Sequence, residues 1–237
     1  DPDCPPMPAF PFPLMIFAAG FGTRMGALTA DRPKPLIPVA GQALIDHALD
    51  QAAGVARIVV NTHYLGDQIA AHLAGRSVRI SPEPEILETG GGLKAALPLL
   101  GPGPVAVLNS DGIWTGANPL AQLAAAWDPS RMETLLLLLP ADRTMGHGAA
   151  GDFRLHPDGR IDRGQGGEDH VYIGAAIVAT DRLATWPEAK FSLNRPWDAM
   201  IAAGRAHGIV HHGAWCDVGR PEGIAVAETL LHDAGHG

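Results

Sequence analysis

Cysteine is scarce in this sequence, and two other features that would point to a particular environment are missing. Only Cys4 and Cys216 occur among 237 residues, without a C-x-x-C pair, which argues against a disulfide framework or a zinc site and fits a reducing compartment. No apolar run is long enough to span a membrane. Basic blocks are absent, and 17 Lys and Arg against 25 Asp and Glu give a net charge of −8. We therefore expect a cytoplasmic protein that binds neither nucleic acid nor a membrane.

Residues 1–13 contain six prolines and follow neither a helical nor a strand period. They also lack the basic region and the continuous apolar region of a secretion signal. We interpret them as an extended arm and 14–237 as a single domain, because a chain of this length buries one substantial core. Glycine and charged residues dominate from 141 to 167, and we assign about 141–180 to an insertion in that domain.

Short apolar runs alternate with segments of helical period along the chain. Strands are predicted at 14–17, 57–61, 78–81, 105–108, 134–139, 171–178 and 209–210. Helices are predicted at 44–53, 64–74, 93–97, 118–127 and 197–203, with a closing helix after Pro221 and a hairpin within 153–162. Alternating strands and helices predict an α/β fold with a parallel sheet, and ligands bind such sheets beyond the carboxyl ends of the strands.

A glycine-rich loop follows the first predicted strand. It reads A-A-G-F-G-T-R-M-G (18–26), so its glycines let the backbone take positive φ and come close to a ligand. Exposed N–H groups after a strand form a cradle for an anion, and Arg24 adds a guanidinium suited to phosphate. Lys34 stands between two prolines, which stiffen its backbone. A plain turn is the alternative for the loop, whose spacing matches neither the dinucleotide nor the Walker motif. Together these features predict a polyphosphate site.

Three further stretches carry candidate site residues. Three consecutive glycines (90–92) open a helical pattern, which costs helix stability unless something approaches the backbone closely; a flexible turn is the alternative. Asp111 follows the strand at 105–108, where a carboxylate is well placed to bind Mg²⁺, although it could also be a turn residue. Asp217 lies in W-C-D-V-G (215–219) near the chain end. His63 and His147 are weighed as site residues, but a satisfied loop histidine explains His63 as well.

The strings A-A-G-F-G-T-R-M (18–25) and P-K-P-L (33–36) resemble the N-terminal signature of the sugar-1-phosphate nucleotidyltransferases. The same family resemblance extends over L-E-T-G-G-G (87–92), N-S-D-G (109–112), G-D-F-R-L (151–155) and W-C-D-V-G. One departure is Ala27, where such proteins usually carry proline. The resemblance implies a Rossmann-like three-layer α/β sandwich with a mixed, mainly parallel central sheet, in which the insertion at about 141–180 binds the sugar.

The resemblance also implies roles for residues of these motifs. Nucleotide binding falls to Ala18, Ala19, Gly20, Gly22, Thr23, Arg24, Glu83, Gly90 and Gly91. Sugar-phosphate binding falls to Lys34, Asn109, Gly151 and Gly174. Arg24, Lys34 and Asp111 are the catalytic residues, and Asp111 and Asp217 share one Mg²⁺. The reaction does not require a general base such as His147, because the attacking sugar phosphate is already an anion near neutral pH.

The implied reaction joins a nucleoside triphosphate and a sugar 1-phosphate and releases pyrophosphate. The motifs are most similar to those of the short family members that use UTP and N-acetylmuramate 1-phosphate in cell-wall recycling. Two alternatives remain open: mannose or glucose 1-phosphate with GTP or dTTP, and a regulator that binds a nucleotide sugar without turnover. We expect a monomer or a small homo-oligomer.

Overall fold

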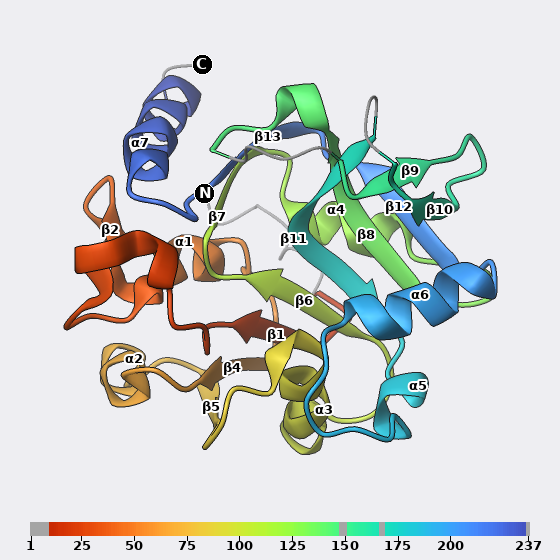
Figure 1. Cartoon of the computed structure of the whole chain (residues 1–237), viewed down its shortest axis with the longest axis horizontal. Coiled ribbons are helices and arrows are strands. Elements are labelled where there is room, and N and C mark those ends of the chain that lie inside the picture. The colour runs from red at the N-terminus through yellow and green to blue at the C-terminus, as the bar shows by residue number, and fades with distance from the viewer. Residues whose placement is uncertain (1–9, 147–150, 166–168, 236–237) are drawn as a thin grey trace, which may run out of the picture.

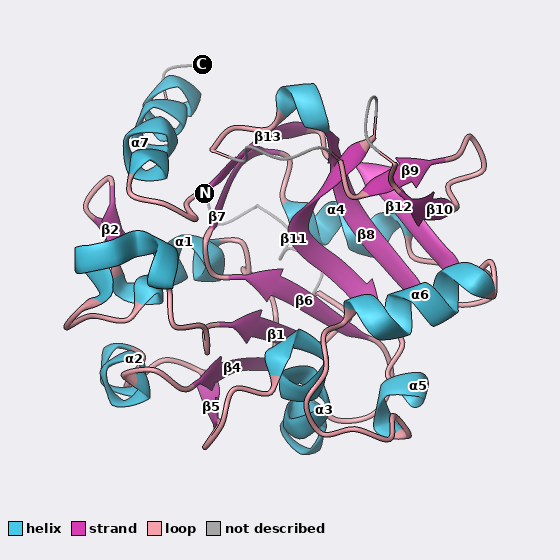
Figure 2. Cartoon of the chain, viewed as in Figure 1, coloured by secondary structure: helices cyan, strands magenta, loops and turns pink. Residues whose placement is uncertain are grey.

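A nine-stranded mixed sheet runs through the protein, with helices on both of its faces (Figures 1 and 2). The computed structural model describes residues 10–146, 151–165 and 169–235, so most of the predicted arm and His147 lie outside the described residues. The main path of the sheet has the order β10-β9-β11-β6-β1-β4-β5, and β8 joins β12 to β11. The prediction of one domain with an insertion stays a prediction.

The strands of the sheet lie close to the predicted runs. They are β1 (Leu14–Phe17), β4 (Ile58–Thr62), β5 (Val78–Pro82), β6 (Val105–Asn109), β8 (Thr134–Pro140), β9 (Phe153–Leu155), β10 (Ile161–Arg163), β11 (His170–Val178) and β12 (Ala206–Val210). Two small sheets pair β2 (Pro38–Val39) with β3 (Gln42–Ala43) and β7 (Gly112–Gly116) with β13 (Gly213–Asp217). The predicted hairpin is confirmed, because β9 and β10 pair in antiparallel register.

The direction of pairing divides the sheet. β1 lies between β4 and β6 and runs parallel to both, and β5 extends the parallel part beyond β4. The carboxyl ends of these four strands therefore meet at one edge. β11 runs antiparallel to β6 and β8, whereas β12 is parallel to β8. The sheet is mixed, as the sequence led us to expect, and its parallel part carries the glycine loop.

Two apolar layers sandwich the sheet because side chains alternate along each strand. Leu14 and Ile16 face a core built with α1 (Leu44–Asp50), α2 (Gly66–His72) and α4 (Pro119–Ala126). Met15 faces the opposite core, built with α3 (Glu88–Leu100), α5 (Asp181–Ala184) and α6 (Asn194–Ala202). Figure 1 shows α3, α5 and α6 in front of the sheet and α4 behind β8 and β11.

A third, smaller core joins the site-bearing edge to the end of the chain. α7 (Glu222–Ala234) packs Ala227 with Ile113 and Cys216 of the β7–β13 ribbon. Burial raises the pKa of the Cys216 thiol to about 11, so this cysteine is an inert core residue. No helix among the described residues is both long and apolar enough to cross a membrane.

Two helices begin earlier than predicted. α3 begins at Glu88 instead of residue 93, so the three glycines lie inside its first turns. Glycine fits these positions because neighbouring residues occupy the space that a side chain would need. A Cβ on Gly91, for example, would collide with the carbonyl oxygen of Ala189. The carbonyl of Phe191 also accepts a hydrogen bond from Gly91 N–H. α6 begins at Asn194, three residues before the predicted start.

Candidate active site

A cavity of about 320 Å³ opens where the parallel strands end. In Figure 1 the arrowheads of β1 and β6 point toward the segment that holds the glycine loop. The residues lining the cavity come from the ends of β1, β4 and β6, the segments after β1, β5, β6 and β13, and the start of α3. They are Phe17, Ala18, Ala19, Gly20, Gly22, Thr23, Arg24, Lys34, Pro35, Asn61, Glu83, Ile86, Glu88, Thr89, Asn109, Ser110, Asp111 and Gly219. The cavity thus gathers segments that are far apart in the chain.

The glycine loop exposes backbone at one position and packs tightly at another. A Cβ on Gly20 would meet nothing within 4 Å, so its backbone is open to the cavity. Gly22 has φ of 65°, and a Cβ there would lie 2.8 Å from Cβ of Lys34. Thr29 Oγ1 donates to the Gly22 carbonyl at 3.2 Å, and Tyr64 Oη donates to the Thr29 carbonyl at 2.8 Å. The predicted anion cradle is therefore held in shape by contacts behind it.

Lys34 and Asp111 are 77 residues apart in sequence and form an ion pair at the cavity. Lys34 Nζ lies 2.7 Å from Asp111 Oδ2, with the two side chains 12% and 30% exposed. Asp111 is fixed by the end of β6, and the neighbouring Ser110 Oγ donates to the Phe17 carbonyl at 2.6 Å. The two predicted catalytic residues therefore share one wall of the cavity and remain accessible from it.

Asp217, at the end of the small ribbon, does not line the cavity itself but lies next to Gly219, which does. It pairs with Gly112 across β13 and β7, and Val218 N–H donates to the Asp111 carbonyl at 2.9 Å. Gly219 lines the cavity, and a Cβ there would lie 2.7 Å from Asp217 Oδ2 and 3.3 Å from Arg24 Nη1. Two carboxylates on hydrogen-bonded segments suit a hard cation. The described part of the chain contains no cluster of three or more His, Cys, Asp or Glu side chains that could hold a metal.

Glu83 and Asn61 form a buried hydrogen-bonded pair at the base of the cavity. Asn61 Nδ2 donates to Glu83 Oε1 at 2.7 Å, and Asn61 Oδ1 accepts from Ala18 N–H at 2.8 Å. Gly90 and Gly91 do not line the cavity. They pack against Phe191 and Ala189, so their assignment to the nucleobase stays a prediction. Glu88 and Thr89, which precede them, do line it.

Of the predicted sugar-phosphate residues, Lys34 and Asn109 line the cavity, whereas Gly151 and Gly174 do not. Asn109 lines the same cavity as Lys34 and Asp111. Gly174 lies behind Asn109 at an irregularity in β11, with φ of 80°, and a Cβ there would come within 3.0 Å of the Asn109 side chain. Gly151 packs against Asp169 and does not line the cavity. Asn109 therefore lies at the cavity, and the absence of a side chain at Gly174 leaves space for it.

Two polar side chains near the cavity have structural explanations. His63 Nδ1 contacts the Glu83 carbonyl at 2.8 Å, and its ring packs edge-on to Phe21. This matches the satisfied loop histidine that the sequence left open. Burial, together with the negative charge of Asp111, raises the pKa of Tyr172 above its usual range, so its phenol stays protonated.

Sequence reasoning missed several residues that line the cavity. They are Phe17, Pro35, Asn61, Ile86, Glu88, Thr89, Ser110 and Gly219. A signal for Asn61 existed, because a polar residue ends an otherwise apolar strand at the edge where ligands bind. Ser110 and Gly219 each adjoin a motif that had been recognised. Nothing local distinguishes Ile86, because only the fold of the segment before α3 turns it toward the cavity.

A mixed α/β sheet with a glycine loop and a Lys–Asp pair at its carboxyl edge defines a class of nucleotide-transferring enzymes. The chain belongs to this class as a member of the family described as the MobA-like NTP transferase domain, which matches residues 14–156. It is a nucleotidyltransferase, and enzymes of this kind generally use a divalent metal ion.

Among its relatives, the N-acetylmuramate alpha-1-phosphate uridylyltransferase of Caulobacter vibrioides is 44% identical over 93% of this chain and 97% of the relative. The protein with the same description from Neisseria meningitidis serogroup B is 35% identical over 91% of this chain and 96% of its own. The crystal structure of HddC from Yersinia pseudotuberculosis complexed with GMP-PN has the same fold, with a TM-score of 0.74, 22% identity and coverage of 93% of this chain and 99% of HddC.

Proposed function

We propose that this enzyme transfers a uridylyl group from UTP to N-acetylmuramate 1-phosphate, giving the UDP-sugar and pyrophosphate, in the cytoplasm as a step of cell-wall recycling. The observation that carries the substrate assignment is the 44% identity, over nearly the full length of both chains, to the uridylyltransferase of Caulobacter vibrioides. The cavity adds a physical argument, since its glycine loop, Arg24 and Lys34 supply the groups that a polyphosphate needs.

The main obstacle to this reaction is the repulsion between two anionic substrates, and positioned charge overcomes it. In our proposal the open backbone at Gly20 and the Arg24 guanidinium hold the β- and γ-phosphates. Lys34 holds the sugar phosphate and the α-phosphate while negative charge develops between them. No side chain has to remove a proton, because the attacking phosphate oxygen is already ionised. Asn109 lines the same cavity as Lys34 and would contact the sugar phosphate there.

Asp111 and Asp217 would hold the Mg²⁺ ion that we propose as cofactor. Their segments are joined by the Val218 N–H to Asp111 carbonyl hydrogen bond, and Gly219 leaves the space between Asp217 and the cavity open. Mg²⁺ usually takes one or two carboxylates and completes its shell with phosphate and water, so two carboxylates suffice. When bound, the ion supplies Lewis-acid stabilisation of phosphate charge. Lys34 must then exchange its contact with Asp111 for one with substrate.

A product assay with UTP, Mg²⁺ and a panel of sugar 1-phosphates tests the proposal. We expect UDP-N-acetylmuramate and pyrophosphate, with N-acetylglucosamine, mannose and glucose 1-phosphates as poorer acceptors. Running the four nucleoside triphosphates in parallel tests the base. A preference for GTP or dTTP with mannose or glucose 1-phosphate would replace the uridylyl assignment. Nucleotide-sugar binding without any turnover would instead support a regulator.

A further inference from the structure

A buried polar pair links the glycine loop to the segment before α3. Asn61 and Glu83 are only 3% and 5% exposed, yet both contribute atoms to the cavity wall. Asn61 stands near the end of β4, and Glu83 directly follows β5. Two polar residues that are this deeply buried in a protein normally have every polar atom engaged, because an unpaired one is costly.

Each oxygen of the Glu83 carboxylate has a partner. Oε1 accepts from Asn61 Nδ2 at 2.7 Å, and Oε2 accepts from Leu87 N–H at 3.0 Å. Asn61 Oδ1 accepts from Ala18 N–H at 2.8 Å. A continuous path of hydrogen bonds therefore runs from Ala18, where the glycine loop begins, to Leu87, which immediately precedes α3.

The segment at the far end of this path is strained and faces the cavity. Glu88 has φ of 62°, a left-handed conformation that is uncommon for a residue other than glycine. Such conformations persist where the surroundings fix them. The Glu83–Leu87 hydrogen bond fixes the residue before Glu88, while Thr89 Oγ1 accepts from Leu193 N–H at 3.0 Å on its other side.

Gly92 supplies independent evidence that the fold makes room for this pair. A Cβ on Gly92 would lie 2.6 Å from Glu83 Oε1 and 2.9 Å from Asn61 Nδ2. Any other residue there would displace the two atoms that form the central hydrogen bond. The third glycine of the run is thus accounted for by a contact inside the protein.

We propose that Asn61 and Glu83 are positioning residues that hold the glycine loop and the 86–89 segment at a fixed separation, so that both ends of one nucleotide are gripped together. Glu83 acts through Leu87 and Asn61, and its carboxylate does not read the nucleobase. Ile86, Glu88 and Thr89 of the 86–89 segment line the cavity and would meet the nucleotide instead. This inference rests on the proposed function for the identity of the nucleotide.

A polarity swap tests the pair. In Glu83→Gln the new amide can accept from only one of two donors, and its NH₂ group confronts the other. In Asn61→Asp two carboxylates face each other. In the double variant the carboxylate introduced at position 61 keeps the bond from Ala18 N–H and accepts a second bond from the NH₂ group of the amide introduced at position 83. The oxygen of that amide still accepts from Leu87 N–H. The double variant also has the net charge of the wild type.

We expect each single variant to weaken UTP binding by about tenfold, the usual effect of one lost charge-assisted hydrogen bond, and the double variant to recover most of that loss. Calorimetric titration of UTP into each protein measures the affinity. In the complete reaction the KM for UTP should rise in the single variants while kcat changes less. Gly92→Ala should weaken UTP binding in the same way with both side chains retained, and Glu133→Gln, outside the cavity, should leave it unchanged.

A double variant as weak as Glu83→Gln would show that the carboxylate itself contacts the nucleotide and would overturn the inference. Wild-type affinity in both single variants would overturn it as well. Thermal unfolding of every variant separates loss of positioning from loss of folding. Failure of the wild type to bind UTP would reject the uridylyl assignment alone, because the same swap can then be run with whichever nucleoside triphosphate binds.

Discussion

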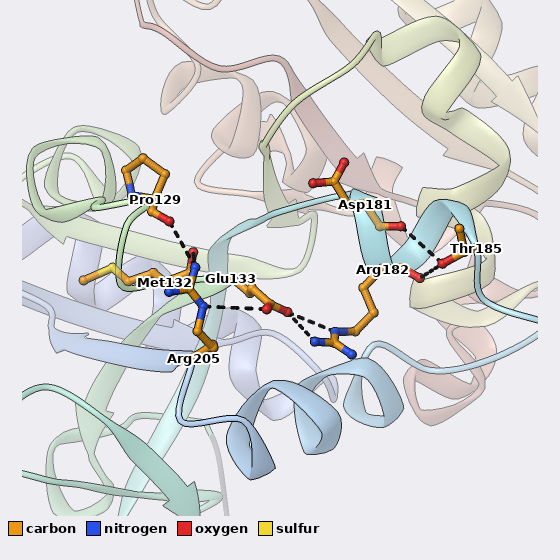
Figure 3. A network of polar contacts seen from close by, with 7 residues as sticks. All are labelled: Pro129, Met132, Glu133, Asp181, Arg182, Thr185 and Arg205. Atoms are coloured by element: carbon orange, nitrogen blue, oxygen red, sulfur yellow. Dashed lines mark hydrogen bonds and ion pairs between the residues drawn. The ribbon is translucent and has the colours of Figure 1, made fainter.

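Both edges of the sheet carry ion pairs between basic and acidic side chains, but the surroundings of these pairs differ. At the carboxyl edge Lys34 meets Asp111 at 2.7 Å in the wall of a cavity. At the amino edge Glu133, just before β8, lies between Arg182 and Arg205 (Figure 3). This edge also has a cavity, of about 540 Å³, which is larger than the first. Size alone therefore does not decide which cavity is the candidate active site.

The difference between the edges is the number of fixed partners for each charge. Arg182 donates to Glu133 Oε2 through Nε at 2.9 Å and Nη2 at 2.8 Å. Arg205 donates to the carbonyls of Ser130 at 2.6 Å and Pro129 at 3.0 Å, besides its 3.6 Å ion pair with Glu133. These bonds tie together α5, the segment before β8 and the turn before β12. Lys34 and Asp111 face open space instead, so a substrate phosphate can take over one of their contacts.

The largest effect should follow from neutralising the acid at the carboxyl edge. Asp111→Asn should lower kcat for UDP-sugar formation at least about 100-fold, because it removes one main electrostatic element of the site. The fold should persist, since Asp111 is partly exposed and β6, which ends two residues before it, is held by β1 and β11. Circular dichroism checks the fold, and pyrophosphate release checks the rate. A variant with near-normal turnover would remove Asp111 from the mechanism.

Displacing the Lys34 side chain by a substitution at a neighbouring glycine should have the next largest effect. Gly22→Ala should reduce kcat/KM by roughly 10- to 100-fold, because its Cβ would come within 2.8 Å of the Lys34 side chain and small misplacements are costly in catalysis. Gly26→Ala, in the same loop, is the control for backbone strain, and its ψ of −128°, against 27° at Gly22, makes its expected strain the larger of the two. It also has positive φ, at 58°, but its Cβ would meet nothing within 4 Å. Both variants should lose stability, and equal losses of activity would contradict the Lys34 explanation.

Breaking the charge network at the amino edge should affect stability alone. Glu133→Gln should lower the free energy of unfolding by about 1 kcal/mol, since the pair is partly exposed to solvent. The kcat should not change. Urea unfolding and the product assay, run on the same preparation, measure the two quantities. Loss of turnover in a folded Glu133→Gln protein would mean that the two edges are coupled.

The smallest effect concerns a polar group at the carboxyl edge that serves the fold. His211 follows β12 and is buried, with Nε2 donating to the Thr115 carbonyl at 3.1 Å and Nδ1 accepting from Gln122 at 2.9 Å. Burial holds its pKa below the ordinary value, so the unfolded chain binds a proton more readily than the folded one. The contribution of His211 to the free energy of unfolding should therefore be fully present above about pH 6.5. Below that pH the free energy of unfolding should fall, by less than about 1.4 kcal/mol per pH unit for one proton.

Urea midpoints at about pH 5 and about pH 7.5, on either side of the ordinary histidine pKa, measure this dependence, with His211→Gln as the comparison. The variant should lose less stability on acidification than the wild type. Some dependence should remain, because burial also lowers the pKa of His170 and His207. Identical pH dependence in the two proteins would show that His211 is not the group that titrates.

The sequence was most informative where chemistry and local structure coincide. Gly22, Arg24 and Lys34 lie within one short stretch, and Asp111 closely follows an apolar strand, so their motifs could be read without a fold. The sequence was least informative for Asn61 and Gly92. Asn61 is a single polar residue in a strand, and the reason for Gly92 is a contact with residues 9 and 31 positions earlier. The glycine run predicted that another group approaches its backbone closely, but it could not show that this group belongs to the protein itself.

By itself the sequence determined the family and the alternation of strands and helices, and it predicted a set of anion-binding residues, because these depend on residue type and near-neighbour spacing. Only the tertiary structure decided that Lys34 meets Asp111, that Gly174 leaves space for Asn109, and that both Glu83 oxygens are engaged. Those contacts join distant segments. They exist because parallel strands bring their carboxyl ends to one edge, where burial makes each polar group find a partner.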